Sequence, residues 1–113
     1  MNCLFCKIIK KEIPAPRVYE DEHAIVIRDI NPQAPVHLLA LPRRHFAGAH
    51  EVGAADNKLF GQLFQAIGKV VVQEKLAVQG YRLVVNYGDK AGQTVPHIHV
   101  HILSGRSLQW PPG

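Results

Sequence analysis

The sequence is poor in sulfur and in aromatic side chains. Its 113 residues include two cysteines, one methionine and one tryptophan, and Phe, Trp and Tyr together make up 7%. Two cysteines are too few for the disulfide framework that stabilises small secreted domains. The chain also lacks any apolar run near the roughly 20 residues that cross a bilayer, and Lys10-Lys11 interrupts the N-terminal segment before the apolar core of a signal peptide could form. We therefore expect a cytoplasmic protein without a membrane partner.

Acidic residues are also scarce relative to basic ones. Nine Asp and Glu face 13 Lys and Arg, which gives a net charge of +4 and a pI near 9.3. A positive balance favours phosphate-bearing ligands. The basic residues are scattered, with only Lys10-Lys11 and Arg43-Arg44 adjacent, so we expect no nucleic-acid partner. A small phosphorylated substrate needs much less basic surface.

Hydrophobic periodicity predicts an α+β fold in one domain, residues 1–113. The clearest element is a long helix whose apolar stripe runs from Leu59 to Val71, with Asp56 as its N-cap and Gly80 as its end. Other segments predict a short helix at residues 4–11 and five strands, at residues 17–20, 23–29, 37–41, 81–86 and 97–103. We expect a five-stranded antiparallel sheet with the helices on one face and a ligand on the other, followed by an extended tail at residues 105–113.

Three histidines alternate with apolar residues near the C-terminus, in the segment Pro96-His97-Ile98-His99-Val100-His101. On a strand, His97, His99 and His101 would share one face and the apolar residues the other, packed on the long helix. The histidine content of this chain predicts only about 0.03 such triads by chance. The pattern therefore indicates chemistry rather than a histidine-rich surface.

Two kinds of chemistry suit the triad. Neutral imidazoles two residues apart on a strand can bind a catalytic zinc, with a third ligand from elsewhere. Alternatively, one imidazole attacks phosphorus. In that case a carbonyl holds its Nδ1–H, and the Nε2 lone pair faces the substrate. The residues alone leave both interpretations open.

The segment His97–Leu103 is similar to the His-φ-His-φ-His-φ-φ signature of the histidine-triad (HIT) superfamily, where φ is an apolar residue. Further segments resemble its Hint branch, namely Phe5–Pro14, Asp29–Pro35, Gly80–Asn86 and Trp110–Gly113. The resemblance implies a HIT-like fold and a hydrolase that cleaves the P–N bond of purine nucleoside 5′-phosphoramidates through a covalent nucleotidyl-histidine. Alternatives are a dinucleoside polyphosphate hydrolase or nucleotidyl transferase, and a nucleotide-binding regulatory module with incidental activity. No catalytic cofactor is expected.

The resemblance also assigns roles to individual residues. His99 would be the nucleophile, His101 and His37 would support it at the phosphate, and Asp29 would accept both ribose hydroxyls, as a carboxylate can. The apolar cleft for the base would comprise Phe5, Ile8, Ile13, Ile27, Ile30 and Leu39. The phosphate and leaving group would lie against Asn86, Gly92, Gln93, Thr94 and Val95, where glycine allows close backbone approach.

Two positions depart from the Hint pattern. Thr94 stands where serine is usual, which keeps a hydroxyl for the leaving group and adds a methyl that can restrict the amine. Arg28 replaces a residue of a common aromatic–histidine pair, so the base cleft would be shaped differently.

The two cysteines form a Cys-x-x-Cys, Cys3 and Cys6, which has the spacing of a zinc knuckle or a redox dithiol. A thioredoxin-like dithiol should follow a strand, and no strand precedes this one. Several HIT relatives carry a similar motif together with histidines like His45 and His97. The resemblance thus implies a closed structural Cys₂His₂ zinc site that ties the N-terminal helix to the histidine strand.

We also expect a homodimer. The resemblance to dimeric Hint proteins implies one, and an exposed sheet edge gains by pairing with a second copy. The tail of one subunit, including Trp110, would then reach the nucleotide site of the other and shape its leaving-group pocket.

Overall fold

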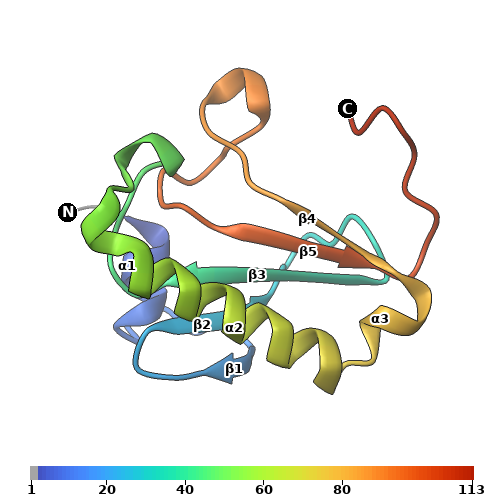
Figure 1. Ribbon diagram of the computed structural model, residues 1–113, viewed down its shortest axis with the longest axis horizontal. Coiled ribbons are helices and arrows are strands. Elements are labelled where there is room, and N and C mark those ends of the chain that lie inside the picture. The colour runs from blue at the N-terminus through green and yellow to red at the C-terminus, as the bar shows by residue number, and fades with distance from the viewer. Residues whose placement is uncertain (1–2) are drawn as a thin grey trace.

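A single antiparallel sheet of five strands organises the structure, a computed structural model that describes residues 3–113. The strands lie in the order β1-β2-β3-β5-β4 (Figure 1), which confirms the expected sheet and places β3 and β5 at its centre and β1 and β4 at its edges. Their bounds are β1 Arg17–Glu20, β2 Ala24–Arg28, β3 Val36–Pro42, β4 Tyr81–Val84 and β5 Val100–Ser104. The helices are α1 Leu4–Ile9, α2 Asn57–Gln73 and α3 Leu76–Gln79, with short 3₁₀ turns at Ala49–Glu51, Ala54–Asp56 and Asp89–Ala91.

The long helix α2 covers one face of the sheet and forms the larger core with it. Alternate residues of the central strands point toward this helix, because side chains on a strand alternate between faces. Val100 and Ile102 of β5 are buried there, as the alternation predicts. The buried members of this core are Ala24, Val26, Leu38, Ala40, Leu63, Ala66, Ile67, Val70, Val71, Leu76, Val100 and Ile102.

The opposite face carries a second, smaller core. Phe5 and Ile8 of α1 pack against residues of β2 and β3, so this face is partly covered, and the expectation that both helices lie on one side is wrong. The buried members are Cys3, Phe5, Ile8, Ile25, Ile27, Leu39 and Leu41. Since the other residues of β3 and β5 also point this way, α1 lies on the same face as the central histidines.

The long helix ends earlier than its predicted end at Gly80. It stops at Gln73, and Lys75 adopts a left-handed conformation (φ 58°) that redirects the chain into α3, which Gly80 (φ 92°) terminates. Asp56 stands at the predicted N-cap position, but its carboxylate does not cap the helix. Its Oδ2 instead accepts the Gly53 amide, and Oδ1 pairs with Arg44 at 2.9 Å.

The histidine strand begins three residues later than predicted. β5 starts at Val100, so His97 and His99 lie in the irregular segment before it. Two backbone bonds explain the late start: the amide of His97 donates to the Val95 carbonyl at 2.8 Å, and that of Ile98 donates to the carbonyl of Phe46, so neither joins the sheet ladder.

After β5, residues 105–113 contain no helix or strand and extend away from the sheet (Figure 1). Within residues 3–113, no helix is long and apolar enough to span a membrane.

Candidate functional site

His37 and His101 meet on the two central strands. His37 Nε2 lies 2.9 Å from His101 Nδ1. The backbone amide of Gln33 donates to His37 Nδ1 at 3.0 Å. An amide can only donate, so Nδ1 of the neutral His37 ring is unprotonated and its proton lies on Nε2. His37 therefore donates to His101 Nδ1, which leaves His101 with a proton on Nε2.

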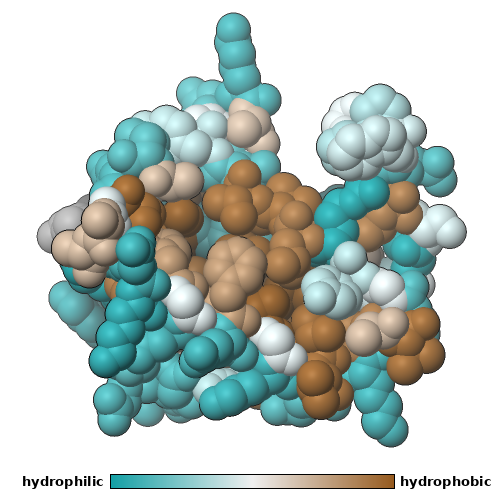
Figure 2. Space-filling model, in the orientation of Figure 1, coloured by the Kyte–Doolittle hydropathy of each residue, from teal (hydrophilic) through white to brown (hydrophobic). Residues whose placement is uncertain are grey.

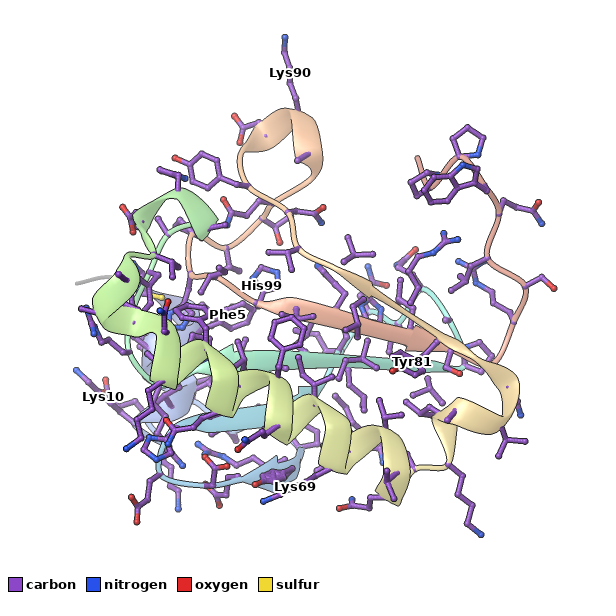
Figure 3. All side chains as sticks on the ribbon, in the orientation of Figure 1. Phe5, Lys10, Lys69, Tyr81, Lys90 and His99 are labelled. Carbon is purple, nitrogen blue, oxygen red and sulfur yellow. The ribbon has the colours of Figure 1, made fainter. Side chains whose placement is uncertain are left out.

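His99 has the opposite arrangement. Its Nδ1 lies 2.7 Å from the backbone carbonyl of His97, which can only accept, so Nδ1 carries the proton and Nε2 bears a lone pair. The ring of Phe5 contacts that of His99 edge-on, with the centroids 5.0 Å apart (Figure 3). The His101 ring lies on another side, at 4.9 Å between centroids. His99 is thus oriented by a carbonyl and two rings, and within residues 3–113 its basic Nε2 has no hydrogen-bond partner.

Burial keeps these rings neutral at pH 7. It lowers the pKa of His37 and of His99, although Asp29 opposes the shift in His37 and the bond to the His97 carbonyl opposes it in His99. Burial, with the neighbouring His99 and His37, lowers the pKa of His101 to about 4. A neutral imidazole is the form that can act as a nucleophile.

Asp29 lies directly after β2, next to His37. Its Oδ1 accepts the amide of Asn31 at 2.8 Å, and its Oδ2 lies 3.4 Å from His37 Nε2. Because His37 is neutral, this second contact is a weak polar contact rather than an ion pair. The carboxylate is partly exposed and keeps acceptor capacity for a ligand hydroxyl.

The apolar residues expected around a base gather beside the histidines, with one exception. Phe5, Ile8, Ile27 and Leu39 are buried members of the smaller core, and Ile13 and Val95 pack against it. Ile30 does not join them, since its side chain is 92% exposed.

The loop between β4 and β5 is fastened by Gln93. The side-chain oxygen of Gln93 accepts the Gly88 amide at 3.1 Å, and its nitrogen donates to the Ala47 carbonyl at 3.0 Å. The Gln93 side chain is therefore occupied in holding two loops together. Gly92 adopts a left-handed conformation (φ 87°) that suits glycine. Of the remaining expected residues, Asn86 is half-buried, Thr94 is exposed, and Trp110 is 80% exposed in this single chain.

A second cluster joins Cys3, Cys6, His45 and His97, whose ligand atoms all lie within 4.8 Å of one another. His97 Nδ1 lies 3.1 Å from His45 Nδ1, 3.5 Å from Cys3 Sγ and 3.6 Å from Cys6 Sγ, and Cys6 Sγ lies 3.4 Å from His45 Nδ1. Bond lengths of about 2.05 Å to nitrogen and 2.3 Å to sulfur in a tetrahedron predict N–N and N–S separations of about 3.4 and 3.6 Å. The four side chains fit a tetrahedral metal site closely.

The tautomer of His97 agrees with this fit. Its Nε2 lies 3.0 Å from the carbonyl of Pro42, so Nε2 carries the proton and Nδ1 offers its lone pair to the cluster. Metal-binding histidines are typically held by such a bond. Cys3 Sγ also accepts the Cys6 amide at 3.4 Å, which fixes the position of the sulfur at the start of α1.

Asp29, His37 and His101 also lie within 4.8 Å of one another, but they do not suit a metal. The Gln33 amide occupies His37 Nδ1, so a metal at Nε2 would face the ring's only proton. The hydrogen bonds thus distinguish a metal cluster around His97 from a proton-bearing pair at His37 and His101. This distinction depends on two backbone groups, the Gln33 amide and the Pro42 carbonyl. Sequence reasoning missed them because backbone groups leave no pattern in the side chains.

The fold and the two clusters define a class of small α+β protein with a histidine-lined site on the face opposite its long helix. The HIT domain model matches residues 10–108. The chain belongs to the HIT-domain family.

Relatives of known name agree with this placement. An uncharacterized HIT-like protein of Synechococcus elongatus is 48% identical over 112 residues, which cover 99% of this chain and 97% of that protein. The 14 kDa zinc-binding protein of Zea mays is 46% identical over 97% of this chain and 87% of its own length. The crystal structure of a HIT family hydrolase from Legionella pneumophila superposes with a TM-score of 0.95 at 47% identity, covering 99% of this chain and 100% of that one. This chain is therefore similar to proteins named as hydrolases and as a zinc-binding protein.

Proposed function

We propose that the chain is a nucleotide hydrolase that cleaves the P–N bond of purine nucleoside 5′-phosphoramidates, with His99 as a covalent nucleophile. The observation that carries the proposal is the bond from His99 Nδ1–H to the His97 carbonyl, because it gives a buried, neutral imidazole whose lone pair lies on Nε2. The HIT family hydrolases among its structural neighbours support a hydrolytic reaction.

The proposed reaction has two displacements. In the first, His99 Nε2 forms a bond to phosphorus as the P–N bond of the substrate breaks, and the amine leaves with a proton from solvent. In the second, water attacks phosphorus and loses a proton to solvent, the bond to Nε2 breaks, and neutral His99 and the nucleoside monophosphate are released. Each step is easier than direct attack by water on the phosphoramidate.

The other residues hold and orient the substrate. His101 Nε2–H donates to the phosphate and stabilises the charge that develops there, with His37 fixing its tautomer. Asp29 accepts the ribose hydroxyls, and the smaller core offers an apolar wall to the purine. The exposed Thr94 hydroxyl contacts the leaving amine. This arrangement is what the resemblance to the Hint branch implies.

We further propose that Cys3, Cys6, His45 and His97 hold a structural zinc ion. Four protein ligands close the coordination sphere, so the ion has no open position for a substrate. When bound, it supplies a cross-link between α1 and the loops that follow β3 and precede β5. The similarity to a zinc-binding protein of Zea mays supports this choice of metal.

An edge strand and a group of exposed apolar side chains support a homodimer. β4 is an edge strand, and apolar side chains gather beside it on the face toward the viewer in Figure 2. Phe64 and Val72 of α2 are 55% and 76% exposed, and Tyr81 of β4 is 45% exposed. A second copy would extend the sheet and cover these side chains. The tail with Trp110 would then reach the partner's site.

Turnover separates this proposal from its alternatives. Adenosine and guanosine phosphoramidates should be hydrolysed at a higher kcat/KM than diadenosine polyphosphates. A preference for the polyphosphates would favour a dinucleoside polyphosphate hydrolase, and tight nucleotide binding without product would favour a regulatory module. Deletion of residues 108–113 should change the preference for the leaving amine more than it changes folding.

A further inference from the structure

His97 connects the Cys3–Cys6–His45–His97 cluster to the proposed nucleophile, because different atoms of this one residue contact each of them. Its Nδ1 belongs to the cluster, its Nε2 bonds to the Pro42 carbonyl, and its own carbonyl accepts the Nδ1–H of His99. The His97 side chain is fully buried. A shift of the His97 ring therefore displaces the carbonyl that orients His99.

The sheet does not hold this carbonyl in place. Ladder bonding begins only at Val100, and the segment before it is fixed by the turn bond from the His97 amide to Val95 and by the bond from the Ile98 amide to Phe46. The His97 side chain also anchors the segment, through its bond to the Pro42 carbonyl and its place in the four-residue cluster.

Helix α1 adds a second route between the cluster and His99. Cys3 and Cys6 are cluster members, and Phe5, between them, contacts the rings of both His97 and His99, with centroids 6.0 and 5.0 Å apart. Figure 3 shows Phe5 pointing toward His99. Movement of α1 away from the cluster would remove ring contact from both histidines.

The geometry of the cluster favours a cation at its centre. Two imidazole nitrogens 3.1 Å apart and two sulfur atoms lie around one point. A positive charge at that point stabilises thiolates and facing lone pairs together. Removal of the cation would release His97, whose backbone touches His99, from one of its attachments.

We propose that the Cys3–Cys6–His45–His97 metal site positions the nucleophile: occupancy fixes His97 and thereby holds His99 in its Nδ1–H form with Nε2 toward the substrate. His97 is a positioning residue in this scheme. The catalytic consequence of this inference rests on the proposed function of His99. The link between the metal and the geometry of His99 does not, because it can be observed without turnover.

The test compares zinc-loaded and chelator-treated protein, both shown to be folded by amide NMR spectra. Long-range ¹H–¹⁵N spectra of the histidine rings report each tautomer directly. In loaded protein we expect a single Nδ1–H form of His99. In metal-free protein we expect a mixture of tautomers or exchange broadening at His99, with His23 and His50 unchanged. An unaltered His99 signal in folded, metal-free protein would overturn the proposal.

Kinetics provide a second readout that a purely structural metal would not move. Metal removal, or His45→Gln, should lower kcat on a phosphoramidate at least tenfold while KM changes less than twofold, and added zinc should restore kcat in the metal-free wild type. His50→Gln, which removes an exposed histidine outside both clusters, should match wild type. Equal kcat with and without metal contradicts the proposal. If loaded protein shows no turnover at all, the proposed function fails, and the NMR comparison alone decides this inference.

If metal-free protein unfolds, the test compares the zinc form with a form loaded with the larger Cd²⁺, which should keep the chain folded and lengthen the bonds at the cluster. The proposal then requires the His99 ring signals to shift between the two metals, while His23 and His50 stay constant. Identical His99 signals with both ions would show that the metal only attaches α1.

Discussion

The proposed zinc site makes a quantitative prediction about stability. A metal that binds only the folded chain raises the free energy of unfolding by RT ln(1 + [Zn]/Kd), which is about 4 kcal/mol when free zinc is 1,000 times Kd. The observed ligand separations of 3.1–3.6 Å differ from the tetrahedral values by only a few tenths of an ångström, so the folded chain presents the four ligands near their metal-bound positions. Because Kd already includes any cost of rearrangement, the stabilisation depends only on the ratio of free zinc to Kd.

Thermal unfolding at fixed protein concentration and buffered free zinc measures this effect. For a domain of this size, about 4 kcal/mol corresponds to a Tm increase of roughly 15 °C, and each tenfold increase in free zinc above Kd adds about 1.4 kcal/mol. Cys6→Ser should lose this dependence on zinc, whereas His50→Gln should keep it. A Tm of the wild-type chain that does not respond to free zinc would refute the reasoning.

Three further predictions address the nucleotide site and the assembly. The pKa of His101 is about 4 in the folded chain and its ordinary value is 6.5, so the unfolded chain binds more protons between these values and the free energy of unfolding should fall as pH decreases from 6.5 to 4. In denaturant unfolding, His101→Gln should reduce the slope of this free energy against pH by up to one proton. An identical slope would contradict the shift. Asp29→Asn should raise KM for ribonucleotide substrates by about tenfold, since a hydrogen bond to a charged group contributes roughly 1.5 kcal/mol. The same variant should leave KM for a 2′,3′-dideoxy substrate unchanged, and equal effects on both substrates would exclude a ribose contact. Val72→Asp should convert the dimer to a monomer in light scattering at micromolar concentration, because it places a charge in the apolar surface of α2. A wild-type chain that is already monomeric would refute the proposed interface.

Local sequence patterns predicted most of the fold. The strand at Arg17–Glu20 and the apolar stripe of the long helix follow from residue spacing, and the structure has both. The two boundaries that differ most depend on one backbone bond between distant segments and on one local backbone conformation. β5 begins late because the Ile98 amide donates to Phe46, and α2 ends early because Lys75 turns left-handed. Neither bond nor turn has a sequence signature.

The candidate site was likewise predictable from the sequence only in part. The spacing of Cys3 and Cys6 and the alternation of the histidines indicated the chemical groups, but the residues alone left metal and nucleophile open for the triad. The structure separates the histidines by their partners: His97 points its lone pair at two cysteines, whereas His99 donates to a carbonyl. His97 and His101 thus belong to two different side-chain clusters, which alternation along a strand could not reveal.

The most direct test of the central claim is mass spectrometry of enzyme quenched within milliseconds of mixing with a slow purine nucleoside phosphoramidate. The account predicts a mass increase of one nucleoside monophosphate on the peptide that contains His99, labile in acid and stable in mild base. The adduct should be absent from His99→Gly, which should still bind nucleotide. Full turnover by His99→Gly, or an adduct located on His101, would contradict the account.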